Sequence, residues 1–180
     1  CYGDGGAIFT NNDELCEIMK SIRIHGSGNN KYDNIRVGLN GRLDTFQAAV
    51  LLEKLTIFED EISKRNQIAD YYRNNLPNQY KEQKIPKNYV SSFAQFSILT
   101  ESKQHRNIVL KKFADKNLPA NIYYQYPLHL QKVFKKLEYK TGDFPYAEKI
   151  ADRIFSIPMH PYLTKNQQDI ILELLHAVAK

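Results

Sequence analysis

Apolar residues recur at helical spacing over two stretches in the first third of the chain. Residues 13–24 predict an amphipathic helix with Asn12 as its N-cap. Residues 44–72 carry a longer apolar face without proline or glycine. They predict one helix of roughly 30 residues, about 45 Å long, that links two lobes. Asp44 and Gln47 have the spacing of a capping box at its start.

Shorter runs alternate in the rest of the chain. The runs that predict extended strands are 7–10, 79–85, 89–99 and 119–124. The runs that predict helices are 102–116, 145–155 and a last helix capped by Thr164. Residues 128–137 are ambiguous, and residues 156–163 predict a proline-fixed loop or short strand. This alternation predicts a small α/β or α+β lobe, joined through the long helix to an incomplete first lobe.

Glycines and asparagines punctuate the first lobe. Gly3, Gly5 and Gly6 fit a tight turn into the strand at 7–10, and cradling a phosphate is the alternative. Residues 25–30 predict a mobile loop or turn, and residues 32–42 show no clear period. The opening turn leads into a strand almost at once, which suggests that this is the C-terminal part of a longer protein.

Composition narrows the class of protein. The 180 residues are 42% hydrophobic and 25% charged, which fits a globular protein. No apolar run is long enough for a transmembrane helix, no signal peptide is recognisable, and the two cysteines favour a reducing cytoplasm. The cysteines and five histidines give no metal-binding spacing. The net charge of +5 suits an anionic small ligand, and without a recognition motif it does not indicate nucleic-acid binding.

The loop before the long helix is the best candidate site by chemistry. Asn40 and Arg42 flank a glycine close to a predicted helix N-terminus. A guanidinium offers a fork of donors that matches phosphate oxygens, and an amide adds another donor. Helix-terminal N–H groups favour the same anions. The alternative is that Arg42 is a surface side chain and Asn40 a turn residue.

Three histidines are further candidates. His160 stands between prolines that restrict its backbone, so it could bind a ligand anion or transfer a proton. The alternative is a half-buried histidine bonded to backbone, and for His129 this alternative is the stronger. His25 could face a ligand or simply be exposed. No order of serine, cysteine, histidine and aspartate residues supports a nucleophilic triad, and no paired carboxylates stand out.

Three segments carry a family resemblance. CYGDGGAIFTNNDEL, IRVGLNGRLDTFQAAVLLEKL and SIPMHPYL resemble the DegT/DnrJ/EryC1/StrS family of pyridoxal-phosphate-dependent sugar aminotransferases, closest to those that act on UDP-linked 3-keto hexuronic acids. The resemblance implies the C-terminal half of a fold-type I (aspartate aminotransferase-like) enzyme. Residues 1–55 would then be the end of the large cofactor domain and the start of the linking helix, and residues 56–180 the small domain.

The same resemblance implies roles for particular residues. Asn40 matches an asparagine that reaches the cofactor phosphate of the partner subunit, and Arg42 and His160 match positions near the nucleotide-sugar substrate. Tyr123–Tyr124 fall where many members have His-Tyr, and the first position departs from that pattern. The Schiff-base lysine of the family lies upstream of residue 1, and neither Lys20 nor Lys31 occupies its position.

The implied protein is a cytoplasmic homodimer that holds pyridoxal 5'-phosphate. It would transfer an amino group, from glutamate, to a nucleotide-linked keto sugar for bacterial surface polysaccharide. Neither a catalytic residue nor a metal ligand is assigned within the chain, and neither nucleic acid nor a membrane is expected as a partner. The alternative is a non-catalytic remnant that binds a sugar nucleotide or dimerises. Which carbon is aminated and which nucleotide is carried stay open at this point.

Overall fold

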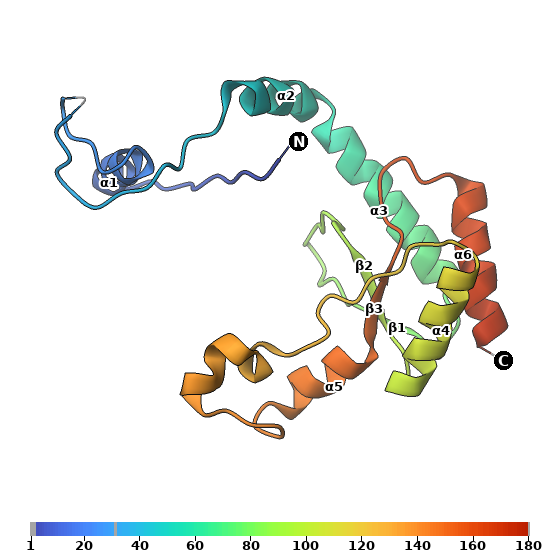
Figure 1. The fold of residues 1–180 in the computed structure, drawn as a ribbon. Coiled ribbons are helices and arrows are strands. Elements are labelled where there is room, and N and C mark those ends of the chain that lie inside the picture. Colours follow the sequence, from blue (N-terminus) through green and yellow to red (C-terminus); the bar gives the residue numbers. More distant parts are fainter. Residues whose placement is uncertain (1–2, 31, 180) are drawn as a thin grey trace. The chain divides into compact units, whose positions relative to one another are not determined.

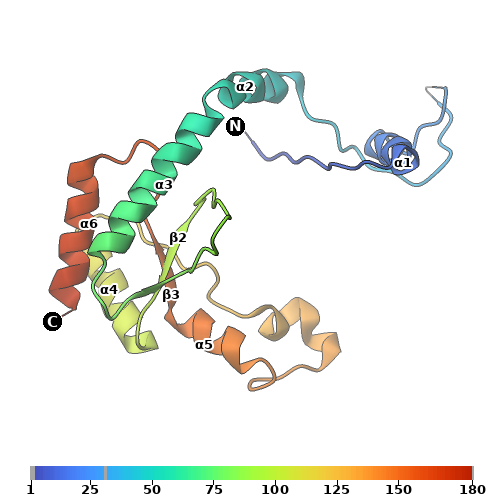
Figure 2. The ribbon, with the colours of Figure 1, turned by 180° about the vertical axis from the view of Figure 1, so that it is seen from behind.

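The computed structural model describes residues 3–30 and 32–179, so Cys1 and Lys31 lie outside the described residues. The chain divides into two compact units, Cys1–Glu59 and Asp60–Lys180. Figure 1 and the reverse view in Figure 2 show the elements of each unit. The division falls shortly after the predicted boundary at residues 55 and 56, and the assignment of the first unit to a large cofactor domain stays a prediction.

The beginning of the first unit contains the helix predicted over 13–24 but lacks the strand predicted over 7–10. Helix α1 (Asp13–Arg23) begins as the sequence predicts, because the Asn12 side chain accepts a hydrogen bond from the Leu15 N–H at 2.9 Å. Residues 7–10 were expected to form a strand, and this prediction is wrong. Within the described residues no strand pairs with this segment, and the Phe9 side chain is 92% exposed. An extended segment without a partner has no ladder to join.

The loop after α1 is a tight backbone crossing. Gly26 O accepts hydrogen bonds from Ile35 N at 2.9 Å and Arg36 N at 3.4 Å. A Cβ atom on Gly38 would lie 2.1 Å from Gly26 N, and one on Gly26 would lie 1.8 Å from Arg36 O. Only glycine permits such an approach, and Gly26 also has a φ of +73°. Residues 25–30 therefore form an ordered turn with several backbone bonds, where the sequence predicted a mobile loop or a turn.

The predicted long helix is two helices. Helix α2 (Thr45–Thr56) ends at Ile57, and α3 (Phe58–Asn75) follows. The Thr56 hydroxyl donates to Glu53 O at 2.7 Å, the carbonyl that a continuing helix would offer to Ile57 N. Ile57 N bonds instead to Leu55 O and Lys54 O. Competition by this threonine accounts for the break, which helical periodicity alone does not show.

The predicted capping box at the start of α2 is also absent. The Asp44 side chain makes no capping hydrogen bond. The Gln47 side chain donates to Asp4 O at 3.2 Å, so it holds the opening segment of the same unit.

The second unit is built on a three-stranded antiparallel sheet in the order β1–β2–β3. The strands are β1 (Lys81–Glu82), β2 (Phe96–Leu99) and β3 (Ile154–Ile157). Phe96 pairs with Ile157, and Leu99 pairs with Ile154. Strands β1 and β2 lie within the extended runs predicted over 79–85 and 89–99. Strand β3 begins at Ile154, inside the helix predicted over 145–155, and ends in the predicted proline-fixed segment.

Helices α3, α4 (Lys103–Asp115) and α6 (Lys165–Val178) form one hydrophobic core with the sheet (Figures 1 and 2). Each helix supplies fully buried side chains, among them Tyr72, Phe113 and Leu175. Strands β2 and β3 supply others, among them Ile98 and Phe155. Close packing of these side chains makes the second unit a domain with its own core.

The segment between α4 and β3 contains little regular structure. The predicted strand at 119–124 is wrong: only Asn121 pairs, in an isolated bridge with Ser156. Two 3₁₀-helices follow, η1 (Leu128–Leu130) and η2 (Lys132–Leu137), in the stretch that was ambiguous by sequence. Helix α5 (Pro145–Arg153) starts with proline at its first position, where a missing N–H is harmless.

The N-terminus of α6 gives the first prediction. Thr164 and Gln167 form a complete capping box. We expect Thr164→Ala to lower the free energy of unfolding of the second unit by about 1 kcal/mol, because an orphan helix N–H loses its acceptor. Thr164→Ser keeps the hydroxyl and should stay close to the wild type in urea denaturation. An alanine variant with the wild-type midpoint would contradict this role.

The glycine crossing gives the second prediction. In Gly38→Ala the new Cβ meets only backbone atoms of Ile22, His25 and Gly26, so the crossing must open. The bond from Leu39 N to Ile22 O should be lost, and amide exchange at Leu39 should accelerate in NMR. Gly6→Ala is the matched control, since its Cβ would meet no heavy atom within 4 Å. Unchanged Leu39 exchange in Gly38→Ala would contradict the account of the crossing.

Candidate functional site

The crossing of Gly26 and Gly38 places Asn40 and Arg42 side by side. The Asn40 backbone pairs with Ile24 in an isolated bridge, and Gly41 N donates to Arg23 O at 2.8 Å. The Arg42 Nε donates to Asn40 Oδ1 at 2.9 Å. The structure thus brings two of the three predicted site residues together, and their binding role stays a prediction.

The pair retains the donors that an anion needs. Both side chains are exposed. Among the described residues, no hydrogen bond uses the Arg42 Nη groups or the Asn40 Nδ2 group. Asn40 Oδ1 accepts the hydrogen bond from Arg42. The amide group of Asn40 that can still bond to a ligand is therefore Nδ2, a donor. Two kinds of N–H donor on one short segment suit a phosphate oxygen cluster.

His160, the third predicted residue, belongs to the second unit and is exposed. Its Nδ1 lies 3.3 Å from the Tyr162 N–H, which donates to it. This bond makes Nδ1 an acceptor and leaves Nε2 as the ring atom for another partner. The alternative interpretation was a half-buried histidine bonded to backbone. The bond to backbone is confirmed, but His160 is exposed.

The loop that carries His160 is fixed to helix α3. The Tyr72 hydroxyl donates to Pro158 O at 3.0 Å, and burial raises the pKa of Tyr72, so this group stays a donor. The Tyr162 hydroxyl donates to Glu61 Oε1 at 2.6 Å. These bonds on both sides of His160 limit the movement of its backbone.

The sequence did not reveal a tyrosine-rich pocket on the second unit. The pocket has a volume of about 470 Å³ and lies between the segment after α4 and helix α5. Tyr123, Tyr124 and Tyr126 line one side, and Ala147 and Ile150 line the other. Pocket walls of this kind bind planar or ring-shaped ligands by stacking and apolar contact. The three tyrosines in four positions were the only sequence signal.

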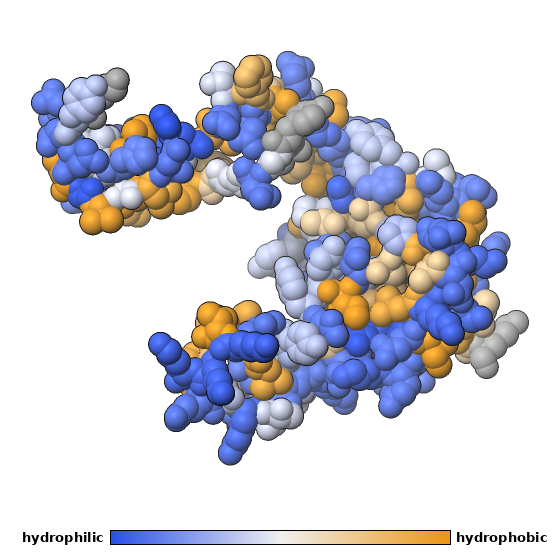
Figure 3. Space-filling model, viewed as in Figure 1, coloured by the Kyte–Doolittle hydropathy of each residue, from blue (hydrophilic) through white to orange (hydrophobic). Residues whose placement is uncertain are grey.

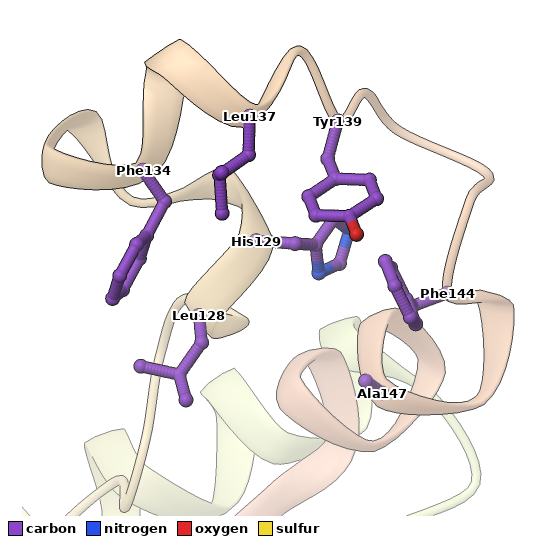
Figure 4. A pocket seen from close by; sticks show the side chains of 7 residues that line it. All are labelled: Leu128, His129, Phe134, Leu137, Tyr139, Phe144 and Ala147. Carbon is purple, nitrogen blue, oxygen red and sulfur yellow. The ribbon is translucent and has the colours of Figure 1, made fainter.

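A second, apolar pocket of about 500 Å³ adjoins η1 and η2, as Figure 4 shows. Phe134, Leu137, Tyr139 and Phe144 point toward it around His129. The His129 side chain is only 7% exposed, and its Nε2 lies 3.0 Å from Glu148 Oε1. His129 is half-buried, as expected, but its ring binds a carboxylate, so the expected bond to the backbone is wrong.

Two further classes of site were searched over the described residues. Across residues 3–30 and 32–179, no three histidine, cysteine, aspartate or glutamate side chains gather as a metal site. In the same part of the chain, none of the helices has the length and apolar character to cross a membrane.

The sequence matches one family of aminotransferases. Residues 1–176 match the sequence profile of the DegT/DnrJ/EryC1/StrS aminotransferase family. The UDP-2-acetamido-2-deoxy-3-oxo-D-glucuronate aminotransferase of Pseudomonas aeruginosa is 39% identical over 176 residues, which are 97% of this chain and 47% of that protein. The chain spans about half the length of the curated relatives it matches.

Solved structures give the same result for the fold. A DegT DnrJ EryC1 StrS aminotransferase from Brucella abortus superposes with a TM-score of 0.90 at 44% identity, over 98% of this chain and 47% of that one. DesV from S. venezuelae superposes with a TM-score of 0.88 at 25% identity, over 95% and 46%. These matches confirm the predicted fold class, the C-terminal part of a fold-type I transferase. The chain belongs to the DegT/DnrJ/EryC1/StrS aminotransferase family.

Proposed function

We propose that this chain is part of a pyridoxal-phosphate-dependent aminotransferase that acts on a nucleotide-linked keto sugar. The observation that carries the proposal is the Asn40–Arg42 pair, held on the glycine crossing with its donors exposed. Family membership over residues 1–176 supports the reaction class. The relative from Pseudomonas aeruginosa, whose name gives a UDP-linked keto sugar acid, supports a substrate of that kind.

The residues present fit the phosphate of the cofactor. The Asn40 Nδ2 group would hold one of its oxygens, since this donor makes no other hydrogen bond among the described residues. When bound, pyridoxal phosphate supplies the electron sink that amino transfer requires. The protein's part at this point is to keep the phosphate, and with it the ring, in one place.

Arg42 and His160 are proposed to bind the substrate. A nucleotide sugar carries a diphosphate, which a guanidinium binds in a bidentate manner. The His160 Nε2 atom can donate to a phosphate or carboxylate oxygen, because Nδ1 already accepts the Tyr162 N–H. The tyrosine-rich pocket at Tyr123 and Tyr124 offers a stacking face for the sugar or its nucleoside.

A cross-subunit homodimer is part of the proposal. Among the described residues 3–59, only Ser21 and Gly26 are buried, so the first unit has no apolar core of its own. Helix α2 buries no residue, and Phe46 is 88% exposed. Figure 3 shows apolar side chains at the surface of this helix. Exposed apolar surface of this extent favours cover by another part of the enzyme or by a second copy.

Four finer features of the proposal come from the resemblance, and the composition also supports the last of them. Glutamate is the proposed amino donor, and bacterial surface polysaccharide is the proposed destination of the sugar. The lysine that binds the cofactor is proposed to lie upstream of residue 1. A cytoplasmic location agrees with the use of only two cysteines.

The phosphate role of Asn40 gives the third prediction. In the complete aminotransferase that contains this chain, Asn40→Ala should weaken retention of pyridoxal phosphate roughly ten- to hundredfold, because a hydrogen bond to a charged group is lost. The measurement is the cofactor absorbance that remains after equilibrium dialysis. Asn29→Ala, an exposed asparagine of the same loop, is the matched control.

Two outcomes would count against the proposal. Wild-type retention in Asn40→Ala would remove the phosphate role from that residue. Absence of the cofactor absorbance from the complete wild-type protein, together with binding of a sugar nucleotide, would favour the non-catalytic remnant instead.

A further inference from the structure

Residues 128–144, which we call the excursion, leave the body of the second unit and return to it at α5. The excursion contains η1 and η2 and ends at the residue before Pro145. Six of the seven residues that line the apolar pocket belong to it, and the seventh is Ala147 of α5 (Figure 4). The excursion has no strand partner, so other contacts must hold it in place.

One carboxylate ties both ends of the excursion. Near its start, His129 Nε2 lies 3.0 Å from Glu148 Oε1. Near its end, Gly142 N donates to both carboxylate oxygens at 2.9 and 3.0 Å, and Phe144 N donates to Oε1 at 3.3 Å. The Glu148 side chain is 18% exposed, and that of His129 is 7% exposed, so the bond between these two side chains is partly shielded from water, whereas the bonds from Gly142 N and Phe144 N lie at exposed positions. Three donors converge on a single acid that stands on a rigid helix.

The position of η1 affects two pockets at once. Leu128 and Ala147 line both the apolar pocket and the tyrosine-rich pocket. The His129 ring also packs on Phe144, with ring centroids 4.7 Å apart. A movement of η1 away from α5 would therefore open the wall that Leu128 gives to the tyrosine-rich pocket.

We propose that Glu148 is a positioning residue that acts through His129: it clasps the excursion to α5 and thereby sets the shape of the tyrosine-rich pocket. The assignment of that pocket to a nucleotide sugar rests on the proposed function, whereas the clasp itself rests on the bonds above. Nothing in the assigned roles of Asn40, Arg42 or His160 requires Glu148.

The clasp should depend on pH. Hydrogen bonds from Gly142 N, and after it from His129 and Phe144 N, hold the pKa of the Glu148 carboxyl below its usual value. The folded clasp therefore favours the ionised form. Its stabilisation is present above the ordinary carboxyl pKa and is lost as the pH falls through the lowered value in the folded state.

Several other charged groups near α5 bond away from Glu148. Asp143 of the excursion accepts from Lys140 N at 2.8 Å. From α4, Arg106 donates to Ala151 O and Lys103 pairs with Asp152. His129 is the titratable side chain that the structure places in hydrogen-bond contact with Glu148.

The test measures amide exchange by NMR on the chain. In Glu148→Gln, the protection of Gly142 and Phe144 should fall roughly ten- to hundredfold at neutral pH, because the charge is lost and one acceptor becomes a donor. The matched control is Glu138→Gln, an exposed carboxylate of the same excursion. Wild-type protection of these two amides should fall in the same way below about pH 4.5, the ordinary value, while Ile98 in the core stays protected.

A second variant shows whether Glu148 positions η1 through His129 or only bonds the far end of the excursion. His129→Ala removes the tie to η1 and keeps the bonds from Gly142 N and Phe144 N at the far end. It should change the amide shifts of residues 123–131 as Glu148→Gln does, and leave Gly142 protected. Unchanged protection in Glu148→Gln, or unchanged shifts over 123–131 in both variants, overturns the proposal.

Titration with UDP-N-acetylglucosamine distinguishes the two proposals. Weaker perturbation of residues 123–131 in both variants than in the wild type supports a clasp that positions a nucleotide-sugar site. If the wild type itself shows no perturbation there, the proposed role of the pocket fails. The exchange data then still decide whether Glu148 clasps the excursion. The wild-type pH series supplies that decision even if Glu148→Gln does not fold.

Discussion

The contact of the Gly26 and Gly38 backbones determines where the candidate phosphate donors stand. At this crossing the chain approaches so closely that any side chain would overlap backbone atoms. The bonds of Leu39 and Gly41 to the end of α1 then fix the backbone on both sides of Asn40. The hydrogen bond of Arg42 to Asn40 follows from this placement. Two residues without side chains thus organise two residues whose side chains carry the proposed chemistry.

The two units differ in how their stability arises. The second unit buries a set of aromatic and aliphatic side chains between its sheet and helices, and its last helix has a complete capping box. The first unit relies on local backbone bonds and keeps its apolar side chains exposed. This contrast supports the proposal that another part of the enzyme or a second copy covers the first unit.

Periodicity predicted the elements that local sequence controls. The caps of α1, α4 and α6 and the proline at the start of α5 are local features, and these helices lie close to their predicted ranges. The break at Ile57 depends on one threonine hydroxyl, which the apolar pattern does not report. The strands at 7–10 and 119–124 failed because strand formation needs a neighbour that sequence alone does not supply.

The candidate sites also divide into features that local sequence predicts and features that depend on tertiary structure. The proximity of Asn40 and Arg42 could be predicted because they are close in sequence, and their binding role is a proposal. The Glu148 clasp joins residues 19 positions apart, and its other donors are backbone N–H groups that every residue possesses. The tyrosine-rich pocket combines two segments separated by the excursion. Such sites are set by tertiary structure, so spacing along the chain could not reveal them.

The central claim is that Asn40 serves the cofactor of the partner subunit. Its direct test mixes two forms of the complete enzyme, one with Asn40→Ala and one without the cofactor-binding lysine, at a cofactor concentration too low to load the Asn40→Ala form. If Asn40 acts across the dimer, each mixed dimer regains one intact site, and random mixing restores about a quarter of the wild-type activity. If Asn40 acts within its own subunit, neither site of a mixed dimer is intact and no activity is recovered. If Asn40 has no role at the cofactor, the Asn40→Ala form is active before mixing. A mixture that stays inactive although mixed dimers form would contradict the account.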